Sequence, residues 1–203
     1  MDPLSILKDI FLEEVPVLSS PTSPKNLTDH YRQELRNSYF DEVCVGANYS
    51  HLESKIERYK YHSDRHLSTE FVEVMSKCVE ASRLYGEYHD WVVIPVPMHW
   101  SRYVLRGFHH TRTLAKRLAK KLSLSLEYPI STRYRPRQSQ LLRTKRIENK
   151  KNSFFIKSGY TVPSHVILID DVISSGATLD EAAKTLKNAW SECVICFVLS
   201  SNQ

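Results

Sequence analysis

The most regular hydrophobic pattern of the chain lies near its C-terminal end. Residues 166–169 are four consecutive apolar residues, typical of a strand buried on both faces, and the run stops at Asp170 and Asp171. Small residues and one glycine occupy 174–178, and apolar positions with helical spacing begin at Ala177. The pattern therefore predicts a strand, a short loop and a helix, in that order.

Strand and helix patterns alternate along much of the remaining chain. Strands are predicted at 39–45, 91–97, 124–128, 154–156 and 193–199, and helices at 52–60, from Phe71 to near Gly86, and around 114–122. Residues 130–152 are polar and basic, which predicts an exposed loop with a helical stretch near 141–150. Strands that alternate with helices imply an α/β fold, with a mostly parallel twisted sheet flanked by helices.

The chain has 203 residues, enough for one domain of ordinary core with an appendage. Residues 1–38 combine a short apolar patch with three prolines among serines and threonines, which predicts a helix or arm followed by a loop. We expect the domain to cover 39–203, with its α/β core at 91–203.

The predicted loop at 174–178 has the properties of an anion site. A strand–loop–helix junction directs backbone N–H groups and the positive end of a helix dipole at one spot, and small side chains let a phosphate approach. Two carboxylates beside it would repel an anion unless they hold a group attached to that anion, such as sugar hydroxyls or a shared Mg²⁺. A phosphorylated sugar satisfies both conditions.

The positions of the glycines exclude two better-known phosphate-binding motifs. The five glycines, at 46, 86, 107, 159 and 176, fit neither G-x-G-x-x-G nor G-x-x-x-x-G-K-[ST] at any position. A surface turn with a helix cap would explain the Ser and Thr residues of the loop, but not the paired acids.

The cysteines and histidines do not predict a metal site. Cys193 and Cys196 have the spacing of a zinc knuckle, but they lie in a predicted strand, where residues three apart face opposite ways. The better interpretation is that these are free thiols in the core of a protein from a reducing compartment. His62 and His66 lack the Glu of H-E-x-x-H, so we expect a solvated pair and no bound zinc.

Charge is distributed unevenly. The net charge is +5, and residues 99–151 contain 15 Lys or Arg against 2 acids. Such a field attracts polyanions, either a metabolite with a pyrophosphate group or nucleic acid, although a solvated basic helix face explains part of it. With no apolar run near the length of about 18 residues that a membrane span needs, and with acids near the start, we expect a cytoplasmic protein without membrane insertion.

The run of apolar residues, Asp-Asp and small-small-Gly-x-Thr resembles the phosphoribosyl pyrophosphate (PRPP) motif of type I phosphoribosyltransferases. Three further stretches narrow the resemblance to the ComF family of competence proteins. They are Tyr49 through Asp64 with Lys60-Tyr61-His62; Val93-Ile-Pro-Val-Pro97 with Arg102 and Arg106-Gly107-Phe108; and Gln138, Leu141, Arg146, Asn149 and Phe154. Together the matches cover about 40–200, and the resemblance implies a type I phosphoribosyltransferase fold with a small hood-like part at 39–90.

The chain departs from the ComF pattern at two places. ComF proteins usually begin with a cysteine-rich zinc ribbon, and nothing in 1–43 has that character. His109 and His110 stand where the family usually has Asn-Gln. The second departure leaves open what these two side chains contact.

The resemblance implies a role for each residue of the motif. Ser174, Ser175, Gly176, Ala177 and Thr178 would hold the 5′-phosphate of PRPP through backbone amides and hydroxyls. Asp170 and Asp171 would accept hydrogen bonds from the ribose hydroxyls or reach Mg²⁺ through water, and would favour the positive charge that develops on the ring.

The resemblance also implies cations for the leaving pyrophosphate. The superfamily's pyrophosphate loop follows the first core strand, which here brings in Pro97, Arg102 and Arg106, and the arginine fork suits phosphate oxygens. The position of 135–151 matches the mobile lid of the superfamily, where Lys145 and Arg146 would contact pyrophosphate. A surface ion pair or a solvated side chain is the alternative for each of these cations.

Three functions remain open on the sequence. The chain is a phosphoribosyltransferase that transfers phosphoribosyl from Mg·PRPP to a nucleobase or an amine with release of pyrophosphate; or a non-catalytic PRPP-binding protein for DNA uptake that binds single-stranded DNA; or a structural protein with a decayed site. Tyr59, Tyr61 and Trp100 are candidates to stack a base. A homodimer is neither favoured nor excluded.

Overall fold

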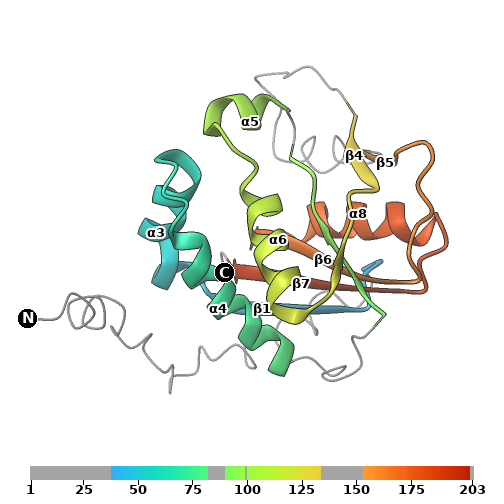
Figure 1. Cartoon of the computed structure of the whole chain (residues 1–203), viewed down its shortest axis with the longest axis horizontal. Helices are drawn as coiled ribbons and strands as arrows, with labels where there is room; N and C mark the ends of the chain where they lie inside the picture. Colours follow the sequence, from blue (N-terminus) through green and yellow to red (C-terminus); the bar gives the residue numbers. More distant parts are fainter. Residues whose placement is uncertain (1–37, 82–89, 99, 134–152, 202–203) are drawn as a thin grey trace, which may run out of the picture.

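The computed structural model describes residues 38–81, 90–98, 100–133 and 153–201. A parallel sheet of five strands, in the order β1-β7-β6-β2-β3, forms its centre (Figure 1). These strands are β1 (Glu42–Asn48), β2 (Val92–Pro95), β3 (Ser125–Leu126), β6 (His165–Ile173) and β7 (Cys193–Ser201). The mostly parallel sheet predicted from the sequence is confirmed.

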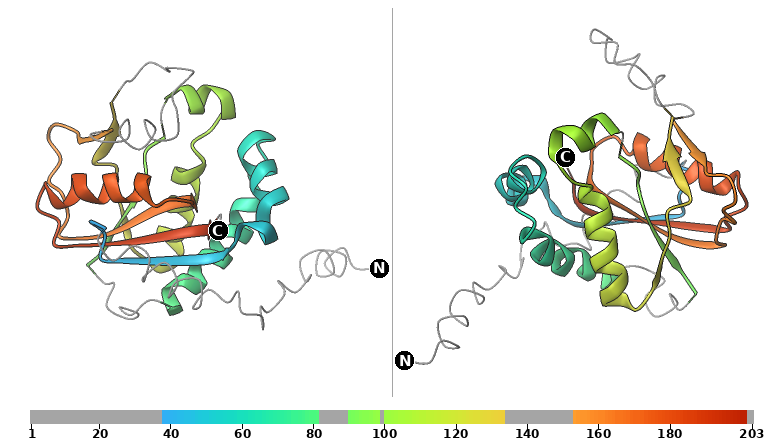
Figure 2. Two further views of the ribbon diagram at one scale, coloured as in Figure 1. Left: turned by 180° about the vertical axis from the view of Figure 1, so that it is seen from behind. Right: turned by 45° about the horizontal axis from the view of Figure 1, so that its top comes forward.

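Helices cover both faces of this sheet, as the two views of Figure 2 show. The helices are α3 (Tyr49–Tyr61), α4 (Leu67–Ala81), α5 (Trp100–Arg106), α6 (His110–Leu122) and α8 (Ala177–Lys187). Side chains of α3, α4 and α6 share one hydrophobic core with the sheet, and those of α8 share the other. Both faces of the central strands are therefore buried, which explains their continuous apolar runs.

A second, two-stranded antiparallel sheet pairs β4 (Ile130–Thr132) with β5 (Phe154–Ile156) on the α8 side. The sequence predicted β5 but placed residues 130–132 in a loop, which is wrong. Ile130 is buried in the same core as Phe154, so this short strand is stabilised by burial and by its partner rather than by a pattern of its own. The helical stretch predicted near 141–150 lies outside the described residues.

Two other sequence predictions are corrected. The first strand begins at Glu42 and runs to Asn48, whereas the sequence placed it at 39–45. Residues 100–106, expected to be a loop, form helix α5. No described helix is long and apolar enough to cross a membrane.

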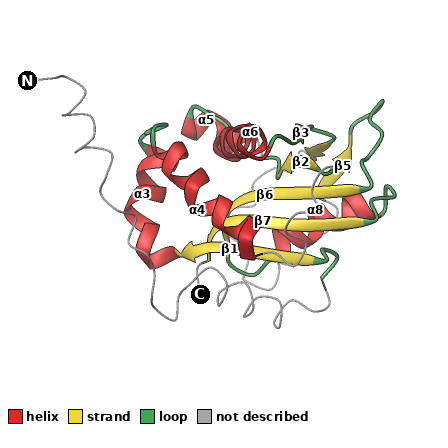
Figure 3. Cartoon of the chain, turned by 60° about the horizontal axis from the view of Figure 1, so that its bottom comes forward, coloured by secondary structure: helices red, strands yellow, loops and turns green. Residues whose placement is uncertain are grey.

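Strand β1 lies in the central sheet, beside β7 (Figure 3). Its residues fall within the 39–90 stretch that the sequence separated from the core, so that stretch supplies an edge strand of the core as well as α3 and α4. A hood-like role for α3 and α4 stays a prediction. Because all five strands are parallel, their carboxyl ends meet at one edge of the sheet, where ligands of open α/β sheets bind.

Candidate functional site

The two neighbouring aspartates of the motif lie inside a strand and not after it. Strand β6 continues through both, with Asp170 paired to Val198 and Val172 paired to Ser200 of β7. The sequence prediction that the strand stops before the acids is therefore wrong. Since successive side chains of a strand point to opposite faces, Asp170 shares the α8 face with Leu168, and Asp171 shares the other face with Ile169.

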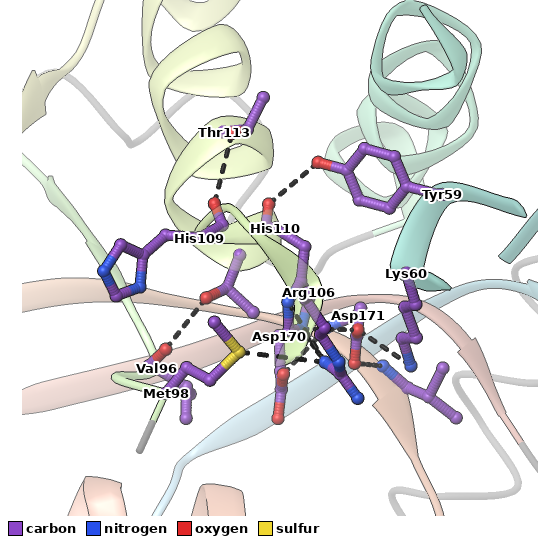
Figure 4. A network of polar contacts seen from close by, with 12 residues as sticks. Tyr59, Lys60, Val96, Met98, Arg106, His109, His110, Thr113, Asp170 and Asp171 are labelled. Carbon is purple, nitrogen blue, oxygen red and sulfur yellow. Dashed lines mark hydrogen bonds and ion pairs between the residues drawn. The ribbon is translucent and has the colours of Figure 1, made fainter. Parts of the chain in front are cut away.

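Asp171 is buried, and the nitrogen atoms of two side chains lie close to its carboxylate. Its Oδ2 atom lies 2.8 Å from Lys60 Nζ at the end of α3 and 2.8 Å from His110 Nε2 at the start of α6. Figure 4 shows the three side chains converging from a strand and two helices. Burial alone would raise the pKa of Asp171, but the Lys60 ammonium and the His110 ring outweigh it and hold the pKa well below its usual range. This carboxylate is ionised and held at physiological pH.

The position of His110 is fixed from two sides. The hydroxyl of Tyr59, buried on α3, donates to the His110 backbone carbonyl at 2.9 Å. The next residue, Thr111, donates from Oγ1 to the Val96 carbonyl at the end of β2, at 3.0 Å. The first turn of α6 is thus tied both to α3 and to the carboxyl end of β2, and His110 is only 4% exposed.

Arg106 lies against the His110 ring. Its Nη1 atom is 3.1 Å from Nδ1 and 3.0 Å from Nε2 of that ring, and 3.8 Å from Met98 Sδ. Its guanidinium also lies over the Tyr61 ring, 5.3 Å from the centroid. Among the described residues no carboxylate pairs with Arg106, and its buried Nε has no hydrogen-bond partner there.

The loop after β6 has the form that the sequence predicted. Ser174 and Ser175 are exposed, and Gly176 caps α8 in the left-handed region with φ of 69°. Ala177 is the first residue of α8, and the Asp180 N–H donates to the Gly176 carbonyl at 2.9 Å. Thr178, half-buried, is the second residue of α8. The N-terminal end of an 11-residue helix thus follows the strand that carries the aspartates after a three-residue loop, 174–176, whose two serines are exposed.

The structure describes the side chains of only some of the remaining predicted site residues. Pro97 is half-buried directly after β2. Arg102 lies on α5, but its side chain is outside the described part of the chain, as are Lys145, Arg146 and the ring of Trp100. Tyr59 is a core residue between Phe71 and Phe108, so it is not a platform for a base, whereas Tyr61 is 55% exposed.

Sequence reasoning missed Lys60 and His110 as site residues. Lys60 stood inside a stretch that matches the ComF pattern, and His110 stood out as a departure from it, so a signal existed for both. Their common partner was not visible, because α3, α6 and β6 are far apart in the sequence and meet only in the fold.

The carboxylates at this edge of the sheet suit a magnesium ion that arrives with its ligand. Within the described ranges no group of three or more His, Cys, Asp or Glu side chains is arranged to hold a metal ion. Mg²⁺ that arrives with a pyrophosphate needs only one or two carboxylates, because phosphates and water complete its shell. Asp170 is half-buried near the carboxyl end of β6 and fits that role, directly or through water.

Comparison with known proteins agrees with this geometry. Residues 111–203, which contain α6, β6 with both aspartates and α8, match the family described as "Phosphoribosyl transferase domain". The competence protein ComFC of Streptococcus pneumoniae is 34% identical over 144 residues, 70% of this chain and 60% of that protein. The chain is a homologue of the ComF competence proteins. The resemblance found in the sequence motifs is confirmed.

Two other relatives have similar names. Competence protein F of Haemophilus influenzae is 28% identical over 74% of this chain and 68% of its own length, and ComFC of Bacillus subtilis is 27% identical over 66% and 53%. The chain therefore spans between about half and two thirds of the curated relatives that it matches.

Solved structures give a weaker comparison. A hypoxanthine phosphoribosyl transferase of Trypanosoma cruzi has a TM-score of 0.42 at 12% identity, covering 66% of this chain and 73% of that one. A Staphylococcus aureus hypoxanthine phosphoribosyltransferase has a TM-score of 0.39 at 13% identity, covering 66% and 62%. Because both TM-scores are below 0.5, these structures add no evidence to the domain match.

Proposed function

We propose that the chain binds Mg·PRPP at the carboxyl edge of its sheet and transfers the phosphoribosyl group to a nucleobase or an amine, releasing pyrophosphate. The observation that carries the proposal is the order of three features at that edge: the half-buried Asp170 near the end of β6, the loop with Ser174 and Ser175 exposed, and the N-terminal end of α8. The domain match over 111–203 supports it.

Each group of the substrate has a counterpart in this arrangement. The 5′-phosphate is received by 174–178, where the exposed Ser175 hydroxyl and the amides that open α8 supply donors. Asp170 accepts from a ribose hydroxyl. A contact of Asp171 with the ribose stays a prediction, because Lys60 and His110 already lie against that carboxylate.

The pyrophosphate is assigned to the Arg106 side of the site. This guanidinium lacks a carboxylate partner among the described residues, so an anionic ligand would neutralise it. Bound Mg²⁺ neutralises charge on the departing pyrophosphate, and a carboxylate at the ribose favours the positive charge that develops at C1. Contacts from Arg102, Lys145 and Arg146 stay predictions.

Titration calorimetry with Mg·PRPP tests the proposal. We expect saturable binding to the wild-type chain, at least about tenfold weaker binding to Asp170→Asn, and unchanged binding to Asp90→Asn. Asp90 is a matched control, because it is exposed and precedes β2 at the opposite end of the strands. The absence of any binding to the folded wild-type chain would contradict the proposal.

The acceptor is tested separately, with a panel of nucleobases and amines. Release of pyrophosphate from PRPP that depends on one of them identifies the second substrate. A protein that binds Mg·PRPP but stays inactive across a broad panel is a binding protein and not a transferase.

A second candidate function is supported by the surface of α6 and by the names of the relatives. Arg112, Lys116, Arg117, Lys120 and Lys121 are all exposed on this helix. Arg117 donates to Thr69, Lys121 pairs with Glu73 and Arg112 lies over the Tyr128 ring. Lys116 and Lys120 are therefore the better candidates to contact a nucleic acid. A PRPP-binding protein that serves DNA uptake would bind single strands with steep salt dependence, reduced by Lys116→Ala with Lys120→Ala.

A further inference from the structure

The end of α3 and the turn after it contact both the side chain and the backbone of Arg106. The Arg106 guanidinium lies over the Tyr61 ring, 5.3 Å from the ring centroid. Ser63, two residues further along the chain, donates from Oγ to the Arg106 backbone carbonyl at 3.4 Å. We propose that Tyr61 is a positioning residue, whose ring holds the Arg106 guanidinium in place for the pyrophosphate of PRPP. This inference rests on the proposed function.

The two residues before Tyr61 anchor the end of α3. The buried Tyr59 hydroxyl donates to the His110 backbone carbonyl at 2.9 Å, and Lys60 Nζ lies 2.8 Å from Asp171 Oδ2 (Figure 4). These contacts join the last turn of α3 to the start of α6 and to β6. Because the backbone at Tyr61 continues directly from this anchored turn, the fold defines where its ring lies.

Rings hold a guanidinium without using up its hydrogen-bond donors. Nη1 of Arg106 is 3.1 Å and 3.0 Å from the two ring nitrogens of His110, and these nearly equal distances place it over the face of that ring. Arg106 therefore lies against two rings, and among the described residues no carboxylate pairs with it. Its buried Nε has no hydrogen-bond partner there, and a phosphate oxygen would supply one.

This role differs from that of a platform for a base, for which the sequence made Tyr61 a candidate. The ring is 55% exposed, so its removal leaves the core of the domain intact. Pyrophosphate contains no base. Binding of Mg·pyrophosphate therefore distinguishes the two roles, because it depends on a residue that positions Arg106 and does not depend on a residue that only stacks a base.

The test is a double-mutant cycle on binding of Mg·pyrophosphate, read by calorimetry. We expect Tyr61→Leu to weaken binding about three- to tenfold, and Arg106→Leu to weaken it about ten- to hundredfold. In the Arg106→Leu background, Tyr61→Leu should change binding less than about twofold, because the ring acts through the arginine. Tyr61→Phe keeps the ring and should stay within about twofold of wild type.

Tyr39→Leu is the matched control. The Tyr39 ring is 46% exposed, and Lys184 Nζ lies over it, 5.4 Å from the centroid, on the α8 side of the sheet. This variant loses a similar contact between a cation and a ring, but not at Arg106, so we expect it to bind Mg·pyrophosphate as wild type does. Equal losses from Tyr61→Leu in both backgrounds, no loss from it at all, or a Tyr61→Phe variant as weak as Tyr61→Leu would overturn the proposal.

A second measurement separates this inference from the proposed function. Nitrogen-15 NMR of the ligand-free chain detects the Arg106 Nε–H group, whose proton shift depends on the ring current of a nearby aromatic side chain. We expect Tyr61→Leu to move this signal and Tyr61→Phe to leave it nearly unchanged. If that is found but neither PRPP nor pyrophosphate binds, the proposed function fails and the hold of Tyr61 on Arg106 stands without that ligand. If pyrophosphate binding depends on Arg106 but Tyr61→Leu does not move the signal, the proposed function stands and this inference fails.

Discussion

Lys60 Nζ, at the C-terminal end of α3, lies 2.8 Å from Asp171 Oδ2 on β6. Both side chains are largely buried, at 13% and 9% exposed. The pair therefore links the first helix after β1 to the strand that carries the two neighbouring aspartates, and it does so where water screens the charges little.

Breaking this pair should be costly. We expect Lys60→Met to lower the free energy of unfolding by about 3–5 kcal/mol, because removal of one partner leaves an incompletely compensated buried charge. Lys55→Met is the matched control on the same helix. Its pair with Glu70 is more exposed, and such pairs contribute about 0–1 kcal/mol. Urea unfolding measures both variants. Equal small losses of unfolding free energy would show that the buried pair stabilises the chain no more than the exposed pair does.

The pKa of Asp171 predicts a pH dependence of stability. Its pKa in the folded chain is held below the ordinary value by Lys60 and His110, against the opposing effect of burial. The folded state therefore binds its proton less readily than the unfolded state, and stability rises with pH across that interval. We expect the contribution to be complete above the unfolded pKa of about 4 and to be lost as pH falls further.

Urea unfolding of wild type and Asp171→Asn from pH 6 to pH 3 checks this sign. The wild-type chain should lose stability more steeply below about pH 4 than the variant, since the variant cannot take up that proton. Asp90→Asn should keep the wild-type slope. If the stability of Asp171→Asn falls as steeply with pH as that of wild type, groups other than Asp171 cause the acid sensitivity.

Substitutions of Gly176 and Gly159 distinguish the effect of backbone strain from the effect of ligand binding. The φ of Gly176 is 69°, a backbone angle that residues with a side chain rarely adopt. Gly159, with φ of 82°, is a matched control on an exposed turn after β5. We expect Gly176→Ala and Gly159→Ala each to destabilise the chain by about 1–2 kcal/mol. Saturating Mg·PRPP, at about 100 times its dissociation constant, should stabilise wild type and Gly159→Ala by about 2.7 kcal/mol, and Gly176→Ala by less. Melting curves with and without ligand report both effects.

Gly46 is required by packing. A Cβ built on it would lie 2.8 Å from the Leu199 carbonyl oxygen and 2.8 Å from Val74 Cγ1. The oxygen belongs to the backbone of β7 and cannot turn away, so we expect Gly46→Ala to destabilise the chain by about 1–3 kcal/mol. Mg·PRPP should still bind the folded fraction. Unchanged stability in urea would mean that β1 and α4 shift apart without cost.

Part of the fold was predictable because its signals are local. The apolar runs 166–169 in β6 and 193–199 in β7 have no polar residue within them, and the parallel, two-sided burial of these strands is what such runs indicate. Helix α5 was not predicted, since seven residues that mix aromatic, basic and apolar side chains have no clear period. Strand β4 has three residues and depends on its partner β5, which follows it by more than twenty residues.

The sequence by itself determined the junction of strand, small-residue loop and helix, because a strand, two acids, small residues and a helix start follow one another in the chain and need no distant partner. Only the tertiary structure decided what the two acids face. The pleat of β6 sends Asp170 and Asp171 to opposite sides of the sheet, and the packing of α3 and α6 on one side brings Lys60 and His110 to Asp171. Contacts between residues so far apart in the sequence follow from the order of strands and helices in space, which no local pattern encodes.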